Sequence, residues 1–157
     1  MSDRYRKLCD ELKAEIPAEM LNQMFAYPYC ELDDFFLGFI EQYQALSVIV
    51  PREMIVVDCG CHLAAQSWYF KDHRGYIGVD KFDAGGSDRY YRITPPNGSH
   101  YFKTIQDFIA EDVPQLFKEN DPMQFFAICN YVNDSAAVEL VRKTFPSLFC
   151  FYPPPSS

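Results

Sequence analysis

Residues 54–80 read MIVVDCGCHLAAQSWYFKDHRGYIGVD and contain two buried-strand patterns separated by a turn and a helix pattern. Residues 54–57 form an unbroken apolar run rich in β-branched side chains, which is typical of a strand covered on both faces of a parallel sheet. We expect Asp58 to end this strand and Gly60 to permit a sharp turn, because glycine has no Cβ that restricts the backbone. Strand, helix and strand of this length predict a right-handed βαβ unit.

The second half of this stretch ends in another acid. From Leu63 onward side chains share faces at helical spacing, which predicts a helix that stops at Gly75. Residues 76–79 form a second apolar run that ends at Asp80. Ligands of open α/β sheets bind beyond the carboxyl ends of the strands. The spacing between Asp58 and Asp80 is close to the roughly 20-residue offset at which a carboxylate binds ribose hydroxyls in this fold class.

The turn after the first strand carries a single glycine, Gly60. A dinucleotide-binding turn uses the three glycines of G-x-G-x-x-G, because the pyrophosphate must approach the backbone closely. His62 and Ala64 occupy positions where further glycines are expected, so a pyrophosphate would meet side chains here. A ligand without phosphates is less demanding, and an NAD enzyme fits poorly.

Residues 58–64, DCGCHLA, resemble the first motif of the class I, Rossmann-like methyltransferases that use S-adenosylmethionine. In that family an acid at the end of the first strand is followed by a glycine-rich turn. The resemblance implies that Asp58, Gly60, Cys61 and His62 bind the cofactor, with Gly60 beside its methionine portion. This sequence departs from the family pattern at the second and third glycines, where it has His62 and Ala64.

The resemblance also implies which later residues contact the ribose and the adenine of the cofactor. Asp80 resembles the family's ribose-binding acid. In the family, a polar residue just after the third strand hydrogen-bonds the adenine amino group, and Gln106 or Asp107 matches this position after a strand expected at 101–104. An alternative is that Asp107 caps a helix at 108–110.

The resemblance also implies where a methyl acceptor is held. Residues 123–129 predict a buried strand, and Asn130 and Tyr131 follow it. Amino-group methyltransferases can carry an Asn-Pro-Pro-Tyr-like motif at this place, whose Asn holds the acceptor nitrogen. Both prolines are absent here. By this resemblance Asn130 and Tyr131 are the catalytic residues that position the acceptor.

The remaining elements define the expected architecture. Helical patterns at 2–15, 18–26 and 33–45 precede the first strand, and 147–152 predicts a fifth strand. We predict an α/β fold: a Rossmann-like three-layer sandwich with a mostly parallel sheet of about five strands and extra N-terminal helices. Residues 1–157 are expected to form one domain, with 1–50 as a helical cover or partial lid and 51–157 as a methyltransferase core that is truncated at its C-terminus.

Composition narrows the class of protein. The chain has 157 residues, 48% hydrophobic content and no apolar run of transmembrane length, so a compact cytoplasmic protein without a membrane partner is expected. A net charge of −8 makes duplex nucleic acid an unfavourable partner, although Arg89 and Arg92 could form a local basic patch. The six cysteines are scattered, which favours reduced thiols. Cys59, Cys61 and His62 lack the second half of a metal site, so no metal is predicted.

Two functions remain open. The first is a methyltransferase that binds S-adenosylmethionine or S-adenosylhomocysteine and acts on an unknown small or protein acceptor. The second is a non-catalytic Rossmann-like module that binds a protein or senses a nucleotide, in which His62, Trp68 or Tyr131 would fill the pocket. In either case a protein partner or a second copy of the chain can pair with the sheet edge at 147–152. A serine hydrolase is not indicated, because the chain has no G-x-S-x-G.

Overall fold

The computed structural model describes residues 3–25, 39–81, 92–130 and 134–151. Within these ranges, five strands form one parallel sheet with the order β3-β2-β1-β4-β5. The strands are β1 (Ile55–Cys59), β2 (Gly75–Asp80), β3 (Gly98–Phe102), β4 (Phe125–Asn130) and β5 (Ser147–Phe151). The predicted α/β, Rossmann-like fold is confirmed.

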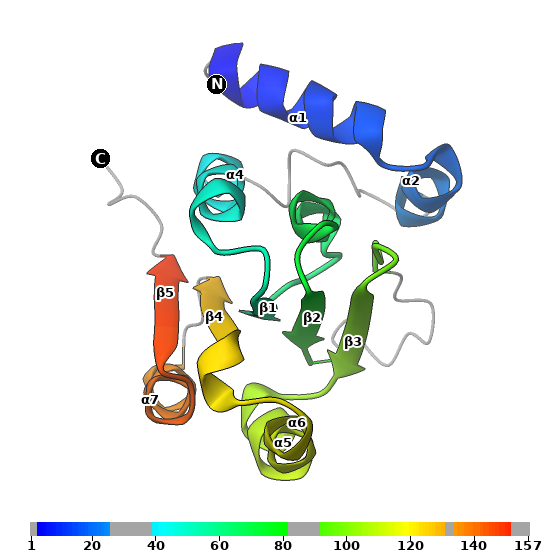
Figure 1. Ribbon diagram of the computed structural model, residues 1–157. Coiled ribbons are helices and arrows are strands. Elements are labelled where there is room, and N and C mark those ends of the chain that lie inside the picture. Colours follow the sequence, from blue (N-terminus) through cyan, green and yellow to red (C-terminus); the bar gives the residue numbers. More distant parts are fainter. Residues whose placement is uncertain (1–2, 26–38, 82–91, 131–133, 152–157) are drawn as a thin grey trace.

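Helices cover both faces of this sheet (Figure 1). One face carries α1 (Asp3–Glu15), α2 (Ala18–Phe25), α4 (Ile40–Ile49) and the 3₁₀-helix η1 (Ala65–Phe70). The other carries α5 (Ile105–Glu111), α6 (Val113–Glu119) and α7 (Ser135–Thr144), and a 3₁₀ turn, η2 (Pro122–Gln124), leads into β4. These two helical layers enclose the sheet, so the central strand β1 is buried along its whole length.

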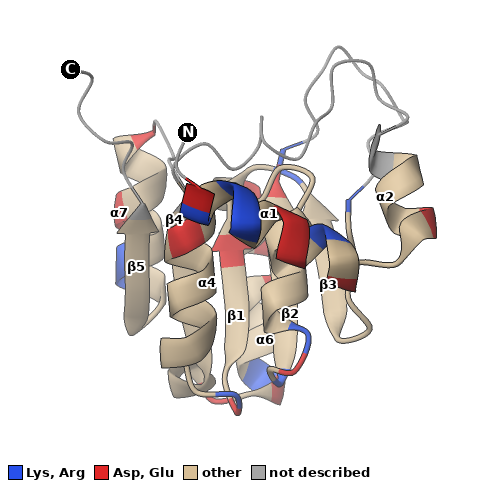
Figure 2. Cartoon of the chain, turned by 90° about the horizontal axis from the view of Figure 1, so that it is seen from above, with Lys and Arg blue, Asp and Glu red and all other residues tan. Residues whose placement is uncertain are grey.

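The N-terminal helices form two tiers above the sheet. In α4, Tyr43 and Leu46 pack directly on Val56 of β1 and Ile128 of β4. The apolar stripe of α1 packs farther out, against α4, η1 and the segment around Ile93. Figure 2 shows that α1 carries both signs of charge, as expected for an amphipathic helix with one solvent-facing side.

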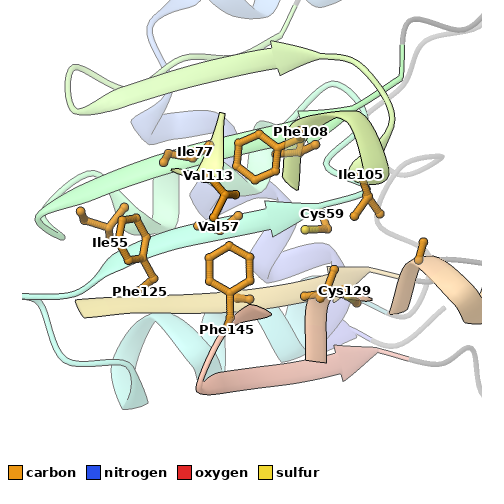
Figure 3. Close-up of a cluster of buried hydrophobic side chains, with 14 residues drawn as sticks. Ile55, Val57, Cys59, Ile77, Ile105, Phe108, Val113, Phe125, Cys129 and Phe145 are labelled. Atoms are coloured by element: carbon orange, nitrogen blue, oxygen red, sulfur yellow. The ribbon is translucent and has the colours of Figure 1, made fainter. Parts of the chain in front are cut away.

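The opposite face holds the larger aromatic core (Figure 3). Phe125 of β4 packs against Phe117 of α6 and Phe145, with ring centroids 5.3 and 6.1 Å away. Phe108 of α5 is fully buried beside the ring of Tyr101. These side chains pack α5, α6 and α7 against the sheet. This packing holds in place the loops at the carboxyl end of the sheet.

Several boundaries differ from the sequence expectation. Asp58 does not end the first strand: it lies inside β1 and is fully buried, because its carboxylate is satisfied by side chains. The segment after the turn is a 3₁₀-helix that begins at Ala65, directly after the left-handed Ala64, and it ends at Phe70; short helical segments are commonly 3₁₀. The third strand covers 98–102 and not 101–104.

The strand order identifies the edge where ligands bind in such folds. From β1 the chain moves outward to β2 and β3, then returns to the other side of β1 to form β4 and β5. The direction of winding therefore reverses between β1 and β4. In open α/β sheets a crevice forms at this reversal, beyond the carboxyl ends of the strands.

Candidate functional site

The turn that follows β1 adopts a glycine-like backbone at three alternate positions. The φ angles of Gly60, His62 and Ala64 are 85°, 50° and 59°. Positive φ is strained for residues with a Cβ, at about 1–2 kcal/mol each, and is routine only for glycine. The turn thus has the conformation that glycines would permit at the second and third positions, although His62 and Ala64 occupy them. The sequence alone does not reveal this.

Hydrogen bonds tie this turn to the end of β2. The N–H groups of Gly60 and Cys61 donate to the carbonyl oxygen of Val79, over 2.7 and 3.3 Å. The N–H of His62 donates to Asp80 Oδ2 over 2.9 Å. These three donors have protein acceptors, so they are not available to a pyrophosphate.

Asp80 lies at the carboxyl end of β2, where the sequence places it. Its side chain is 18% exposed, and His62 Nδ1 lies 3.8 Å from Oδ2 with the imidazole 59% exposed. Its backbone carbonyl accepts a hydrogen bond from Arg92 Nη2 over 2.8 Å. Asp80 is thus held through both its backbone and one carboxylate oxygen, and its side chain still reaches the surface.

Asp58, the other acid of the motif, lies beneath the turn and is fully buried. Tyr43 donates to Oδ1 over 2.7 Å, and Tyr76 and Gln66 donate to Oδ2 over 2.6 and 2.9 Å. Burial raises the pKa of this carboxyl group, while the three donors act in the opposite direction. Gln66 also donates to the carbonyl oxygen of Cys61, which connects Asp58 to the turn. The observed role of Asp58 is to anchor the turn from below.

Arg92 supports the same region from the side of β3. Its guanidinium group donates to the carbonyl oxygens of Tyr101 and Asp80 and lies 4.1 Å from the ring centre of Phe102. The residue is only 3% exposed. Arg92 therefore does not belong to a surface basic patch, because carbonyl groups at the ends of β2 and β3 hold it inside; Arg89 lies outside the described residues.

Cys61 and His100 fill the space above Gly78. A Cβ placed on Gly78 would lie 2.4 Å from His100 Nδ1 and 3.0 Å from Cys61 Sγ, so only glycine fits here without rearrangement. His100 Nε2 donates to the carbonyl oxygen of Ile93 over 3.0 Å. Burial lowers the pKa of His100 to about 4, so it is neutral at pH 7. Burial also raises the pKa of the Cys61 thiol, whose side chain faces the interior.

The two candidate adenine contacts, Gln106 and Asp107, lie in the first turn of α5. Thr104 caps this helix by accepting a hydrogen bond from the N–H of Asp107 over 3.1 Å. The alternative that Asp107 caps a helix at 108–110 is therefore wrong, because the helix begins at Ile105. Gln106 Nε2 donates to Asp134 Oδ2 over 2.8 Å, which joins the first turn of α5 to the N-cap of α7.

Asn130 is the last residue of β4, and its backbone pairs with Phe151 of β5. Its position at the carboxyl end of the strand beside β1 agrees with the sequence expectation. The side chain of Asn130 and the whole of Tyr131 lie outside the described residues. Asp134, which directly precedes α7, caps this helix by accepting from the N–H groups of Ala136 and Ala137.

Comparison with known proteins identifies no family: no family model matches the sequence, and no curated protein matches it. Across the described ranges, no group of three or more His, Cys, Asp or Glu side chains is arranged to hold a metal ion. No helix in the same ranges is long and apolar enough to cross a membrane.

Proposed function

We propose that this chain binds S-adenosylmethionine at the carboxyl end of its sheet and transfers the methyl group to an acceptor. The observation that carries the proposal is the turn after β1. Its backbone has positive φ at Gly60, His62 and Ala64, and it is hydrogen-bonded to the acid at the end of β2. His62 and Ala64 stand where the resembled motif has further glycines, and positive φ is routine only for glycine.

The hydrogen bonding of the turn favours a ligand without phosphates. Its first three N–H groups already have acceptors in Val79 and Asp80. S-adenosylmethionine offers ribose hydroxyls and an adenine amino group, which suit a carboxylate such as Asp80 and an amide such as Gln106. Its positive sulfonium is also compatible with a chain of net charge −8.

The residues named here act by binding and orientation. The bound cofactor supplies an activated methyl group, and its in-line transfer depends mainly on proximity and alignment. Asp80 would hold the ribose, and Gln106 or Asp107 the adenine. Asn130 and Tyr131 would position the acceptor. No dedicated acid–base pair is required, which accords with the buried, structural environment of Asp58.

The alternative is a non-catalytic module in which side chains fill the ligand site. Trp68 packs in the core beside α1 and is 8% exposed, so it does not fill the end of the sheet. The imidazole of His62 is 59% exposed. Trp68 therefore lies away from the site, and His62, although it lies beside Asp80, keeps most of its imidazole in solvent, which supports the binding proposal.

Calorimetric titration with S-adenosylmethionine and S-adenosylhomocysteine tests the proposal without knowledge of the acceptor. We expect dissociation constants in the micromolar range, which corresponds to about −8 kcal/mol. Absence of heat and of any thermal shift at millimolar ligand would reject cofactor binding and favour the non-catalytic module. A methyl-transfer assay with radiolabelled cofactor and candidate acceptors then tests turnover separately.

Replacing Asp80 with alanine should weaken cofactor affinity about 10- to 150-fold, or about 1.5–3 kcal/mol, the scale of a hydrogen bond to a charged group. Calorimetry on folded protein measures this loss. Asp72→Ala is the matched control, because Asp72 precedes β2 and its carboxylate is 61% exposed. That variant removes the same charge and should bind normally. Equal affinity of the two variants would place the ligand away from Asp80.

A further inference from the structure

Three cysteines lie side by side across the sheet. Cys59 of β1 is the register partner of Cys129 of β4, and Cys129 is the partner of Cys150 of β5. Paired residues of parallel strands point to the same face, and all three contribute to the core beneath α5 and α7. Figure 3 shows Cys59 and Cys129 near the carboxyl ends of their strands.

The spacing of this row decides which chemistry it permits. Neighbouring strands are about 4.8 Å apart, so the outer two cysteines are separated by about twice that distance. One thiophilic ion binds sulfur at about 2.3 Å and cannot be reached by all three thiols in a straight row. A disulfide, in contrast, joins residues whose Cα atoms are about 4.4–6.8 Å apart, which fits adjacent strands. The row therefore permits pairwise oxidation.

Burial and position distinguish the two possible pairs. Cys59 is 0% exposed and lies in the central strand, where a small oxidant has no access. Cys150 is partly exposed and lies on β5, the edge strand of the described sheet. Cys129 is 1% exposed but adjoins Cys150, so its reaction needs no entry of the oxidant. The accessible pair is Cys129 with Cys150.

The electrostatic environment of the thiols also favours Cys129 over Cys59 as the partner of Cys150. Hydrogen bonds from the thiols of Cys59 and Cys150, and more weakly the charge of Arg142, lower the pKa of the Cys129 thiol, against the effect of burial. In the same row, the hydrogen bond to Cys129 and burial raise the pKa of Cys59. Of these two buried cysteines, Cys129 is therefore the better nucleophile, because the thiolate is the reacting form.

We propose that Cys129 and Cys150 form an oxidisable pair that a low-molecular-weight disulfide converts into a cross-strand disulfide. With oxidised glutathione, the Cys150 thiolate attacks one glutathione sulfur, releases one glutathione thiolate and forms a mixed disulfide. The Cys129 thiolate then attacks the Cys150 sulfur and releases the second glutathione. Two protons and two electrons pass from the protein to the oxidant. This proposal does not depend on cofactor binding.

Peptide mapping of the intact, folded chain tests the pair directly. The protein is incubated with oxidised glutathione, quenched in acid, alkylated in denaturant and digested with trypsin without reduction. Cys129 lies in the tryptic peptide 119–142, Cys150 in 144–157, and Cys59 with Cys61 in 53–71. We expect a linked species of 119–142 and 144–157 that lacks two hydrogen atoms relative to the free peptides.

Matched variants separate this pair from its neighbours. Cys150→Ser should abolish the linked species, whereas Cys59→Ser should retain it; circular dichroism confirms that each variant is folded. A mixed disulfide at Cys150 that never resolves, a link from either peptide to another cysteine, or no reaction at Cys150 would each overturn the proposal. Because Cys150 is partly exposed, its serine variant should keep the fold, so the test does not rest on a disrupted core.

Discussion

Asp58→Ala is expected to lower the free energy of unfolding by about 3–5 kcal/mol. The substitution removes the shared acceptor of Tyr43, Tyr76 and Gln66, and all four residues are buried. Donors that lose their acceptor inside a protein pay the full desolvation penalty, because water does not reach them. Urea unfolding of the variant and the parent chain measures the difference.

A graded series tests whether Asp58 acts as the hub of this network. Tyr76→Phe removes one donor only and should lower the unfolding free energy by about 1–2 kcal/mol. Asp58→Asn keeps the shape of the side chain and one acceptor oxygen. Its loss of unfolding free energy should therefore lie between those of Tyr76→Phe and Asp58→Ala. If Asp58→Ala were no worse than Tyr76→Phe, the carboxylate would not be the shared anchor that the structure shows.

The same carboxyl group carries a pH dependence of defined sign. Burial raises its pKa in the folded protein above the ordinary value of 3.8, so between these two values the folded state binds more protons than the unfolded state. Its contribution to stability should therefore fall as the pH rises through this window. The stability of the parent chain relative to Asp58→Asn should decrease from about pH 4 upward. An increase would mean that the three donors outweigh burial.

Phe125→Ala is expected to lower the free energy of unfolding by about 3–5 kcal/mol. Phe125 is 0% exposed and packs against Phe117 and Phe145, whose rings also contact each other. Figure 3 shows Phe125 and Phe145 in this core. Truncation removes apolar contact and leaves a cavity that three packed elements cannot close easily.

The matched control for this cavity is Phe149→Ala on the neighbouring strand. Phe149 is 45% exposed, so its loss should be on the order of 1 kcal/mol. Urea unfolding should show lower midpoints with unchanged slopes for both variants. Equal losses would contradict the assignment of Phe125 to the core between the sheet and α6.

Local sequence patterns predicted the central strands of this protein and their order along the chain. The apolar run at 54–57, the glycine at Gly60 and the second run ending at Asp80 predicted the central βαβ unit, and five strands were expected where five are described. These features depend on periodicity and turn chemistry within a few residues, which a local pattern contains. The same strand patterns predicted that the candidate site lies at the carboxyl end of the sheet.

The contacts of the polar groups at the carboxyl end of the sheet depend on how distant segments pack together. Asp58 was expected to end a strand and face a ligand, yet Tyr43, Gln66 and Tyr76 enclose its carboxylate. Arg92 turns inward to carbonyl groups, and the cysteine row depends on strand order. A buried polar group is stable only if distant segments supply its partners. Since those partners are far apart in the chain, local patterns cannot identify them, and packing alone determines which residues remain available for function.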